Sequence, residues 1–202
     1  MIGLDFGCPE IEVSCIFPMT IPNLSTPFSA PRHVILCDET GRPQGTADLV
    51  AAHSGHGQLH LAFSVYIFRP DRQSLLIQQR SAGKKLWPLI WANTCCSHLR
   101  EGETLLDAGR RRLREEMGLD CDLTVGPEFI YRAVDPQARG VEHEFDQILL
   151  GTVNGDPLPD PGEVAAWQWL EIGDLQRRMR EQPDQFAPWF HLGLPLVPSQ
   201  RR

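Results

Sequence analysis

Residues 91–119 read Trp-Ala-Asn-Thr-Cys-Cys-Ser-His-Leu-Arg-Glu-Gly-Glu-Thr-Leu-Leu-Asp-Ala-Gly-Arg-Arg-Arg-Leu-Arg-Glu-Glu-Met-Gly-Leu, and place a thiol, an imidazole and an acidic helix in one short unit. Thr104 and Asp107 form a capping-box pattern, and Gly118 suits the position just after a helix C-terminus. The spacing of the apolar residues predicts a helix over 103–117. Its expected apolar stripe consists of Leu105, Leu106, Gly109, Leu113 and Met117. Arg112 and Glu116 lie four residues apart and should share a face of this helix.

Composition restricts the class of protein. With 202 residues, 42% of them hydrophobic, the chain can bury one core, and we expect a single domain. The net charge of −7 argues against an extended nucleic-acid surface, so an anionic ligand needs a local basic cluster. No run approaches the roughly 18 apolar residues of a membrane span. The six cysteines fit neither a small disulfide scaffold nor a C-x-x-C metal pattern, which favours a reducing, cytoplasmic setting.

The remaining chain predicts an irregular N-terminal arm followed by alternating strands and helices. Residues 1–31 contain five prolines and no Lys or Arg, so they resemble neither a secretory signal nor a transit peptide. Apolar runs predict strands at 34–37, 61–68, 75–80, 142–153 and 165–170. Residues 172–181 predict a second helix that ends before Pro183.

Histidines and carboxylates recur around these predicted strands. His53 and His60 lie seven residues apart before the 61–68 run, and His98 follows Cys96 by two residues. Glu142 and Glu144 lie in an apolar segment whose strand period of two would direct both carboxylates to one face. The same alternation turns His143 away from Glu142 and Glu144, and His56 lies between His53 and His60. His143 and His56 are therefore poorer candidates for a metal site.

The 97–119 segment resembles the helix motif of Nudix hydrolases, G-x5-E-x7-R-E-U-x-E-E-x-G-U. The positions that match are Glu103, Arg111, Leu113, Glu115, Glu116, Gly118 and Leu119. Ser97 replaces the glycine, and Arg112 replaces a glutamate that the hydrolases use to hold catalytic Mg²⁺. The resemblance therefore implies that the helix is retained and hydrolysis is disabled. Without the rest of the chain, a surface helix with salt-bridged side chains would be the simpler interpretation.

From about Arg32 to Pro195 the chain resembles type I isopentenyl diphosphate isomerases. The resemblance rests on the histidine pair, the Arg80-Ser-Ala-Gly-Lys84-Lys85 segment, the Cys96/His98 segment, the Glu142/Glu144 segment and Ala187-Pro-Trp189. It implies an α/β Nudix-like α/β/α sandwich with a mixed central sheet over residues 32–202. It also implies an enzyme that moves a double bond between isopentenyl and dimethylallyl diphosphate in isoprenoid biosynthesis.

The resemblance assigns catalytic roles to four residues. Cys96 and Glu144 match the acid and base on opposite faces of the alkene, although the order in which they act stays open. Tyr131 matches a tyrosine beside that glutamate, and Trp189 matches a ring that faces the developing carbocation. Adjacent Cys95 is expected to pack in the core.

The resemblance also implies two metal ions and a set of cations. His53, His60, His98, Glu142 and Glu144 would hold one Mg²⁺, Mn²⁺ or Zn²⁺ ion with nearly octahedral geometry. Glu116 would help to hold a diphosphate-bound Mg²⁺. Arg80 and Lys84 would contact the diphosphate of the prenyl substrate, with Lys85 and Arg112 as supporting charges. We expect a monomer or weak dimer that binds neither nucleic acid nor membrane.

Two departures keep alternatives open. Leu49 stands where family members usually carry a diphosphate-binding lysine, and Leu99 stands where a proline is common. Leu49 puts substrate affinity in question and is the one feature that favours a non-catalytic paralogue that binds prenyl diphosphates. A Nudix diphosphate hydrolase is the main alternative enzyme, and Arg112 and Cys96 argue against it.

Overall fold

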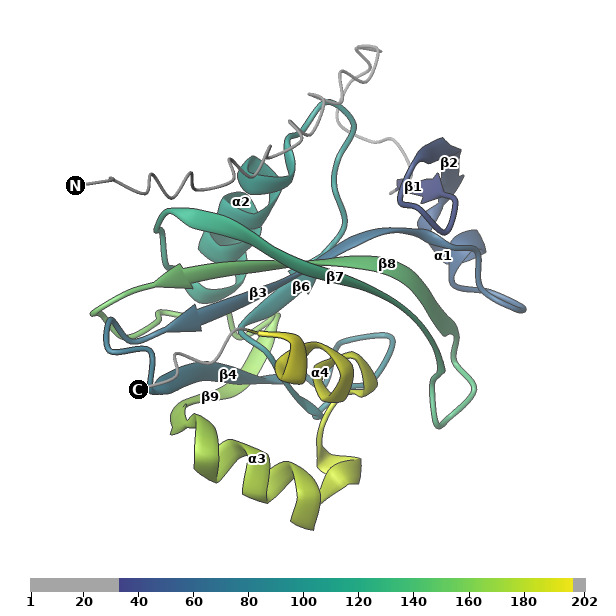
Figure 1. Cartoon of the computed structure of the whole chain (residues 1–202). Helices are drawn as coiled ribbons and strands as arrows, with labels where there is room; N and C mark the ends of the chain where they lie inside the picture. The colour runs from purple at the N-terminus through teal and green to yellow at the C-terminus, as the bar shows by residue number, and fades with distance from the viewer. Residues whose placement is uncertain (1–32, 198–202) are drawn as a thin grey trace, which may run out of the picture.

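The computed structural model describes residues 33–197, which form a nine-stranded sheet with helices on both sides (Figure 1). The strands are β1 (His33–Cys37), β2 (Pro43–Asp48), β3 (His60–Phe68), β4 (Ser74–Arg80), β5 (Trp91–Ala92), β6 (Cys95–Ser97), β7 (Leu123–Val134), β8 (Val141–Thr152) and β9 (Val164–Glu171). The helices are α1 (Leu49–Ala52), α2 (Leu105–Met117), α3 (Ile172–Glu181) and α4 (Pro188–Gly193), with 3₁₀ turns at Pro183–Gln185 and Leu194–Leu196.

Strand β3 lies at the centre of the mixed sheet. It runs parallel to β8 and antiparallel to β1, β4 and β6, while β7 pairs with β8 and β9 with β4. The β3–β8 register sets His60 opposite Glu144, and the β7–β8 register sets Tyr131 opposite Glu144. Because paired residues point to the same face of a sheet, these three side chains come together.

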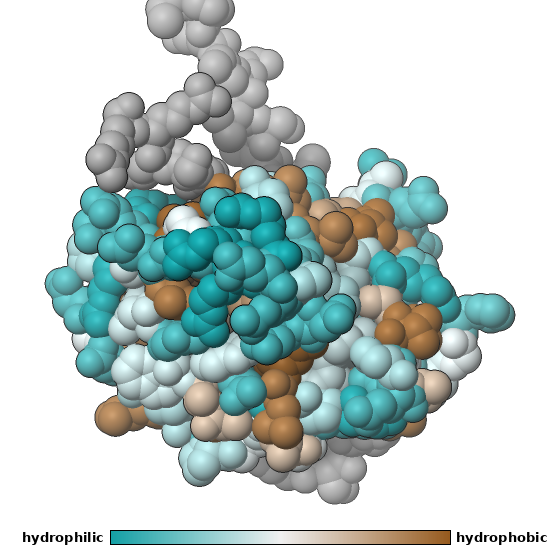
Figure 2. Space-filling model, turned by 90° about the horizontal axis from the view of Figure 1, so that it is seen from below, coloured by the Kyte–Doolittle hydropathy of each residue, from teal (hydrophilic) through white to brown (hydrophobic). Residues whose placement is uncertain are grey.

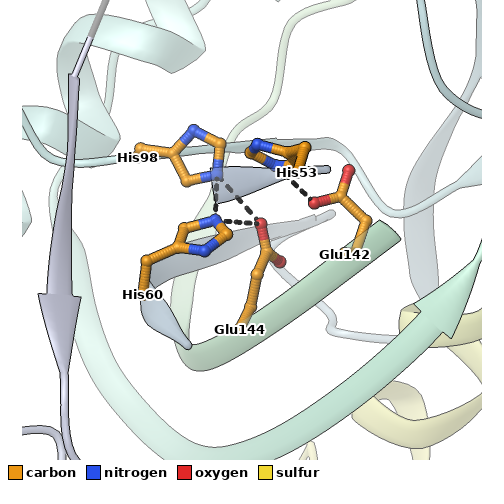
Figure 3. A group of neighbouring side chains, drawn as sticks. All are labelled: His53, His60, His98, Glu142 and Glu144. Atoms are coloured by element: carbon orange, nitrogen blue, oxygen red, sulfur yellow. Dashed lines mark hydrogen bonds and ion pairs between the residues drawn. The ribbon is translucent and has the colours of Figure 1, made fainter. Parts of the chain in front are cut away.

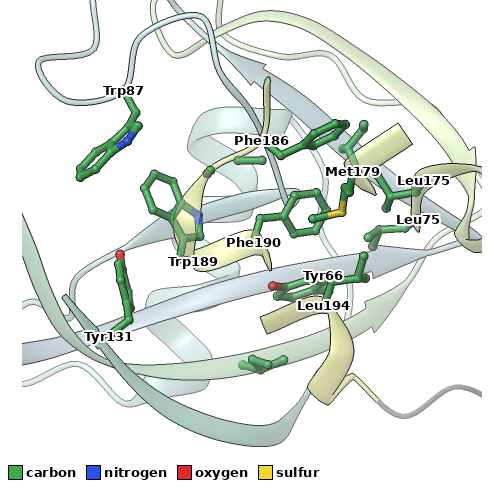
Figure 4. Close-up of a cluster of buried hydrophobic side chains, with 14 of the residues drawn as sticks. Tyr66, Leu75, Trp87, Tyr131, Leu175, Met179, Phe186, Trp189, Phe190 and Leu194 are labelled. Atoms are coloured by element: carbon green, nitrogen blue, oxygen red, sulfur yellow. The ribbon is translucent and has the colours of Figure 1, made fainter. Parts of the chain in front are cut away.

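The two faces of the sheet carry separate apolar cores. Helix α2 covers one face, and α3 and α4 cover the other (Figure 1). Figure 4 shows the second core, where Phe186, Trp189 and Phe190 pack over Tyr66 and Leu75. Cys95 packs in the α2 core and Cys96 contacts the opposite core, which confirms that neighbouring residues of β6 point in opposite directions. The face in Figure 2 is mostly hydrophilic, with apolar side chains in separate patches.

Helix α2 is defined by its caps, as the sequence predicts. The Thr104 side chain accepts a hydrogen bond from the Asp107 N–H, and Gly118 adopts a left-handed φ of 63°. The predicted start at residue 103 is wrong by two residues, because Thr104 is the cap. Leu106 is also wrongly placed in the apolar stripe. It stays exposed, and the buried face runs instead through Ala108, Gly109, Leu113, Glu116 and Met117.

The other predicted strands and the helix over 172–181 are confirmed within one or two residues. Sequence reasoning missed β7, the longest strand together with β8, because Gly126-Pro127 resembles a turn. In the structure a register shift between Val125 and Glu128 accommodates these two residues as a bulge. The arm at 1–31 lies outside the described residues, so the division into an arm and a 32–202 domain stays a prediction. Within 33–197, no helix is long and apolar enough to cross a membrane.

Candidate active site

A pocket of about 220 Å³ opens at the end of the sheet where α1, β6, β8 and α4 converge. Its lining includes most of the residues singled out from the sequence: His53, Arg80, Lys84, Lys85, Cys96, His98, Arg112, Tyr131, Glu142, Glu144 and Trp189. Of the remaining two, His60 is fully buried, and Glu116 is buried while pairing with the lining residues Lys84 and Arg112. The structure therefore brings the predicted set together around one cavity.

Three histidines and two carboxylates form a compact cluster at this pocket (Figure 3). One potential ligand atom from each of His53, His60, His98, Glu142 and Glu144 lies within 4.8 Å of every other. The Nε2 atom of His53 lies 2.7 Å from Glu142, and that of His98 lies 2.9 Å from Glu144. A cluster of this composition could hold a divalent metal ion.

The imidazole orientations fit a metal ion. The Nδ1 atoms of His53 and His60 lie 2.6 and 2.7 Å from the carbonyl oxygens of Leu49 and Gln58. Since a carbonyl oxygen can only accept, Nδ1 carries the hydrogen in both rings, and Nε2 has its lone pair available whenever the ring is neutral. The Nε2 atoms of His60 and His98 are only 3.1 Å apart, so lone pairs and carboxylates converge on one point. This donor set suits a cation.

Charges in the cluster also shift its acid–base properties. Burial would lower the pKa of His53, but the hydrogen bond and charge of Glu142 outweigh it and raise the pKa to about 8. Burial would raise the pKa of Glu144, but hydrogen bonds from His60 and His98 hold it well below its ordinary value. The Glu144 carboxylate is therefore kept ionised at neutral pH.

Glu144 and Cys96 have contrasting surroundings. The Tyr131 hydroxyl donates to Glu144 Oε2 over 2.6 Å, so both oxygens of this carboxylate have partners. Burial, reinforced by the Asp146 carboxylate, raises the pKa of the Cys96 thiol. Ser64 donates its only hydroxyl hydrogen to Asp146 over 2.6 Å and lies 3.3 Å from Cys96 Sγ, so it offers the thiol lone pairs alone.

Aromatic rings close the pocket beside these groups. Trp189 stands edge-on to Trp87 with ring centroids 5.5 Å apart, and its centroid lies 6.2 Å from that of Tyr131 (Figure 4). The Arg80 guanidinium carbon lies 5.5 Å from the Trp189 ring. Arg80 also donates to the carbonyl oxygens of Leu86 and Trp87, which leaves part of its fork free for a ligand.

Two carboxylates hold the cations on the opposite wall. Arg112 bonds Glu116 and Glu163 at 2.6 and 2.8 Å, and Lys84 contacts the same two residues. Neither oxygen of Glu116 has a well-aligned hydrogen-bond partner within residues 33–197, although the residue is buried. Burial accordingly raises the pKa of Glu116. A buried, under-satisfied carboxylate beside cations is an environment that a metal-bound anionic ligand would complete.

Comparisons with known proteins agree with this geometry. A NUDIX domain model matches residues 58–190. An isopentenyl-diphosphate Delta-isomerase of Nocardia farcinica is 42% identical over 156 residues, which cover 77% of this chain and 89% of that protein. Isopentenyl-diphosphate Delta-isomerase 2 of Aromatoleum aromaticum is 40% identical and covers 83% and 87%. The chain belongs to the isopentenyl-diphosphate Delta-isomerase family.

Solved structures support the NUDIX fold of this family member. A Deinococcus radiodurans protein superposes with a TM-score of 0.66 at 18% identity, covering 83% of this chain and 100% of that one. The MutT protein of Methanosarcina mazei superposes with a TM-score of 0.54 at 13% identity, covering 67% and 89%. The α/β fold with a mixed sheet, expected from the sequence, is confirmed.

Sequence reasoning missed three polar residues of this isomerase-family site. Glu163 precedes β9 and binds Lys84 and Arg112, while Ser64 and Asp146 adjoin Cys96. Asn93 lies three residues before Cys96, but the sequence assigns no contact to it. Alternation along β8 offered one signal, because it puts Asp146 on the same face as Glu142 and Glu144.

Proposed function

We propose that this protein converts isopentenyl diphosphate to dimethylallyl diphosphate in isoprenoid biosynthesis. Relatives about 40% identical over most of their length carry the name isopentenyl-diphosphate Delta-isomerase. The observation that carries the proposal is the division of one pocket into a cationic wall and a wall with a thiol, a carboxylate and aromatic rings. The anionic diphosphate of the substrate needs the cationic wall, and its alkene needs the wall with the proton-transfer groups and the aromatic rings.

The cationic wall binds the diphosphate. Lys84 and Arg112 lie with side chains mostly buried but facing the pocket, and Arg80 supplies free guanidinium donors. Lys85 adds charge at the exposed rim. Glu116, held between Lys84 and Arg112, would help to hold a diphosphate-bound Mg²⁺ ion.

The reaction moves one proton onto the substrate and one off it. A proton added to the terminal methylene carbon converts the alkene to a tertiary cation, and loss of a proton from the adjacent methylene on the diphosphate side forms the new double bond. Cys96 and Glu144 are the acid and base for these two transfers. Tyr131 fixes the carboxylate through its 2.6 Å hydrogen bond. Trp189 presents its π face to the cation, and the aromatic rings around the alkene help to exclude water from it.

The His/Glu cluster is suited to one Mg²⁺, Mn²⁺ or Zn²⁺ ion. Such an ion, when bound, fixes Glu144 and lowers the basicity of its carboxylate. We further propose that the protein is cytoplasmic, acts as a monomer or weak dimer on a small prenyl diphosphate, and binds no nucleic acid or membrane.

The decisive experiment incubates purified protein with isopentenyl diphosphate and Mg²⁺ and analyses the products. We expect dimethylallyl diphosphate and no released phosphate. Released phosphate would favour a Nudix-type hydrolase instead. Arg112 argues against that outcome, because it occupies a metal-ligand position of the hydrolase motif. Tight binding of isopentenyl diphosphate without any product would favour a non-catalytic paralogue.

A further inference from the structure

Asn93 is a fully buried amide in the short connection between β5 and β6, close to the proposed catalytic residues. Its Nδ2 lies 3.1 Å from the Val65 carbonyl oxygen and 3.0 Å from the Cys95 carbonyl oxygen. Both neighbours can only accept, so the amino group must face them. The orientation of the amide is thereby fixed, and its carbonyl oxygen Oδ1 points the other way.

That oxygen accepts two hydrogen bonds from the site. The Cys96 thiol donates to Asn93 Oδ1 over 3.2 Å, and the Trp189 indole Nε1–H donates to the same atom over 3.1 Å. A single buried oxygen therefore joins the sulfur on β6 to the aromatic ring on α4. Trp189 is 96 positions away in the sequence, so no local property of the chain sets this distance.

The backbone adds a second tether between the same two segments. The Ala187 N–H donates to the Trp91 carbonyl oxygen over 2.9 Å, two residues before each of the paired side chains. The segment that carries Trp189 is thus held to Trp91 through the Ala187 backbone, and the Trp189 ring is held by Asn93. A tryptophan ring has one N–H, and that donor is fully used by this contact.

We propose that Asn93 is a positioning residue that keeps the Cys96 thiol and the Trp189 ring in one fixed relation around the reacting carbons. The inference rests on the proposed function, since it assumes that both groups act on the alkene. Asn93 makes no contact with the cationic wall among the hydrogen bonds of residues 33–197. Its loss should therefore disturb the alkene geometry and leave diphosphate binding intact.

The first test compares Asn93→Ala with Thr94→Val in steady-state kinetics. Thr94 is an equally buried neighbour whose hydroxyl bridges the Ile67 N–H and the Leu76 carbonyl oxygen, so it ties strands together without facing the pocket. We expect Asn93→Ala to lower kcat about a hundredfold, the scale of a reacting group displaced by 1 Å, with KM changed less than about threefold. Thr94→Val should lose stability but keep its kcat.

The second test reads the hydrogen bond directly from the indole ¹H–¹⁵N resonances of the five tryptophans. The Trp189 resonance is identified by its absence in Trp189→Phe, and it should move upfield in Asn93→Ala but not in Thr94→Val. If Asn93→Ala does not fold, the milder truncation Asn93→Ser takes its place with the same expectations. The kcat losses of Asn93→Ala and Trp189→Phe should also be less than multiplicative in the double variant.

The outcomes separate the two proposals. An unmoved Trp189 resonance, or an Asn93 variant with wild-type kcat, would overturn the positioning role while the isomerase assignment stands. Equal kcat losses in Asn93→Ala and Thr94→Val would also overturn it, because the effect would then be structural. A wild-type protein without isomerase activity would overturn the proposed function, and the catalytic part of this inference with it.

Discussion

Cys95 and Cys96 show how one residue step changes chemistry. Cys95 is fully buried in the core beneath α2, whereas Cys96 lines the pocket and contacts Ser64 and Asn93. The two side chains have the same chemistry and differ only in the face of β6 to which they point. Alternation along a strand is therefore sufficient to decide which thiol faces the pocket.

The pair gives a matched test of the acid/base assignment. Cys96→Ala should lower kcat by about 10²–10⁴-fold, the usual contribution of a positioned proton-transfer group, without unfolding the protein. Cys95→Ala should retain activity and lose about 1–2 kcal/mol of stability through a small cavity. Isomerisation kinetics and urea denaturation measure both effects. An active Cys96→Ala protein with an inactive Cys95→Ala counterpart would show that the roles are reversed.

Leu49 is an uncharged residue of the pocket lining, at a position where an added cation would affect substrate affinity. It is half-buried and lines the pocket, and its backbone carbonyl accepts from His53. A lysine at this position would keep that carbonyl and add a charge to the pocket.

We predict that Leu49→Lys lowers KM for isopentenyl diphosphate roughly fivefold, or about 1 kcal/mol, with little change in kcat. The contact lies far from the reacting carbons and is made equally in the ground and transition states. The gain should shrink as salt is raised. Val50→Lys is the matched control, since Val50 is 54% exposed and should give a smaller effect. A KM that stays level or rises at low salt would contradict the missing-cation argument.

At the scale of elements, two glycines in or beside helices have opposite roles. Gly118 ends α2 with φ of 63°, and a Cβ there would lie 2.5 Å from the Leu158 carbonyl oxygen. Gly173 lies in the first turn of α3, where a Cβ would meet no atom within 4 Å.

Gly118→Ala should therefore destabilise the protein by at least about 1–2 kcal/mol, through left-handed strain and a backbone clash. Gly173→Ala should stabilise it by about 0.4–1 kcal/mol, because it restricts only the unfolded chain. Urea denaturation of both variants measures whether the free energy of unfolding falls or rises as predicted. A Gly118→Ala protein as stable as the parent would mean that this helix end can rearrange at no cost.

Asp135 links the β7–β8 hairpin to the pocket loop. Its carboxylate accepts from Arg139 over 2.7 Å and from the Trp87 N–H over 2.9 Å, and Trp87 has a positive φ of 44°. The hydrogen bond from Arg139 lowers the pKa of Asp135, despite opposition from burial. This clamp holds the loop that carries Lys84 and Lys85 against the hairpin.

Because the folded pKa of Asp135 is depressed, its stabilising contribution is complete above the unfolded value of about 3.9. It is lost progressively as pH falls from that value through the depressed folded pKa. Asp135→Asn should therefore lower the free energy of unfolding most above about pH 5, and the difference from wild type should narrow towards pH 3. Denaturation curves at both pH values test this. A pH-independent difference would show that packing, not charge, dominates at Asp135.

At the scale of the whole molecule, the His/Glu cluster joins segments that are far apart in the sequence. Its members come from the end of α1, from β3, from the segment after β6 and from β8. A cation bound there links all four segments in the folded chain only, so it should stabilise the fold in proportion to its occupancy.

We predict that the protein purifies with a divalent ion that survives gel filtration and is absent from His53→Ala. Restoring the ion at 100 times its Kd should stabilise the chelator-treated wild type by about 2.7 kcal/mol and leave His53→Ala unaffected. His143→Ala is the control, since His143 points to the Gly57 carbonyl oxygen and not into the cluster. Elemental analysis measures the metal content, and thermal denaturation measures the stability of each variant. Unchanged metal content in His53→Ala would remove His53 from the ligand set.

The sequence by itself determined the features that depend on local backbone geometry. Thr104 and Gly118 mark the ends of α2 because capping needs only neighbouring residues, and alternation places Glu142 with Glu144 and separates Cys95 from Cys96. The resemblance to the family's motifs also indicated which side chains would surround one pocket.

Only the tertiary structure decided how segments distant in sequence meet. The parallel pairing of β3 with β8 sets Glu144 beside His60, and the C-terminal segment brings Trp189 to Asn93. Glu163 and Asp146 gained partners in the same way, and β7 continued past Gly126-Pro127 because pairing with β8 outweighs local turn preference. Such contacts depend on the register of the whole sheet and the packing of both cores, which no local pattern encodes.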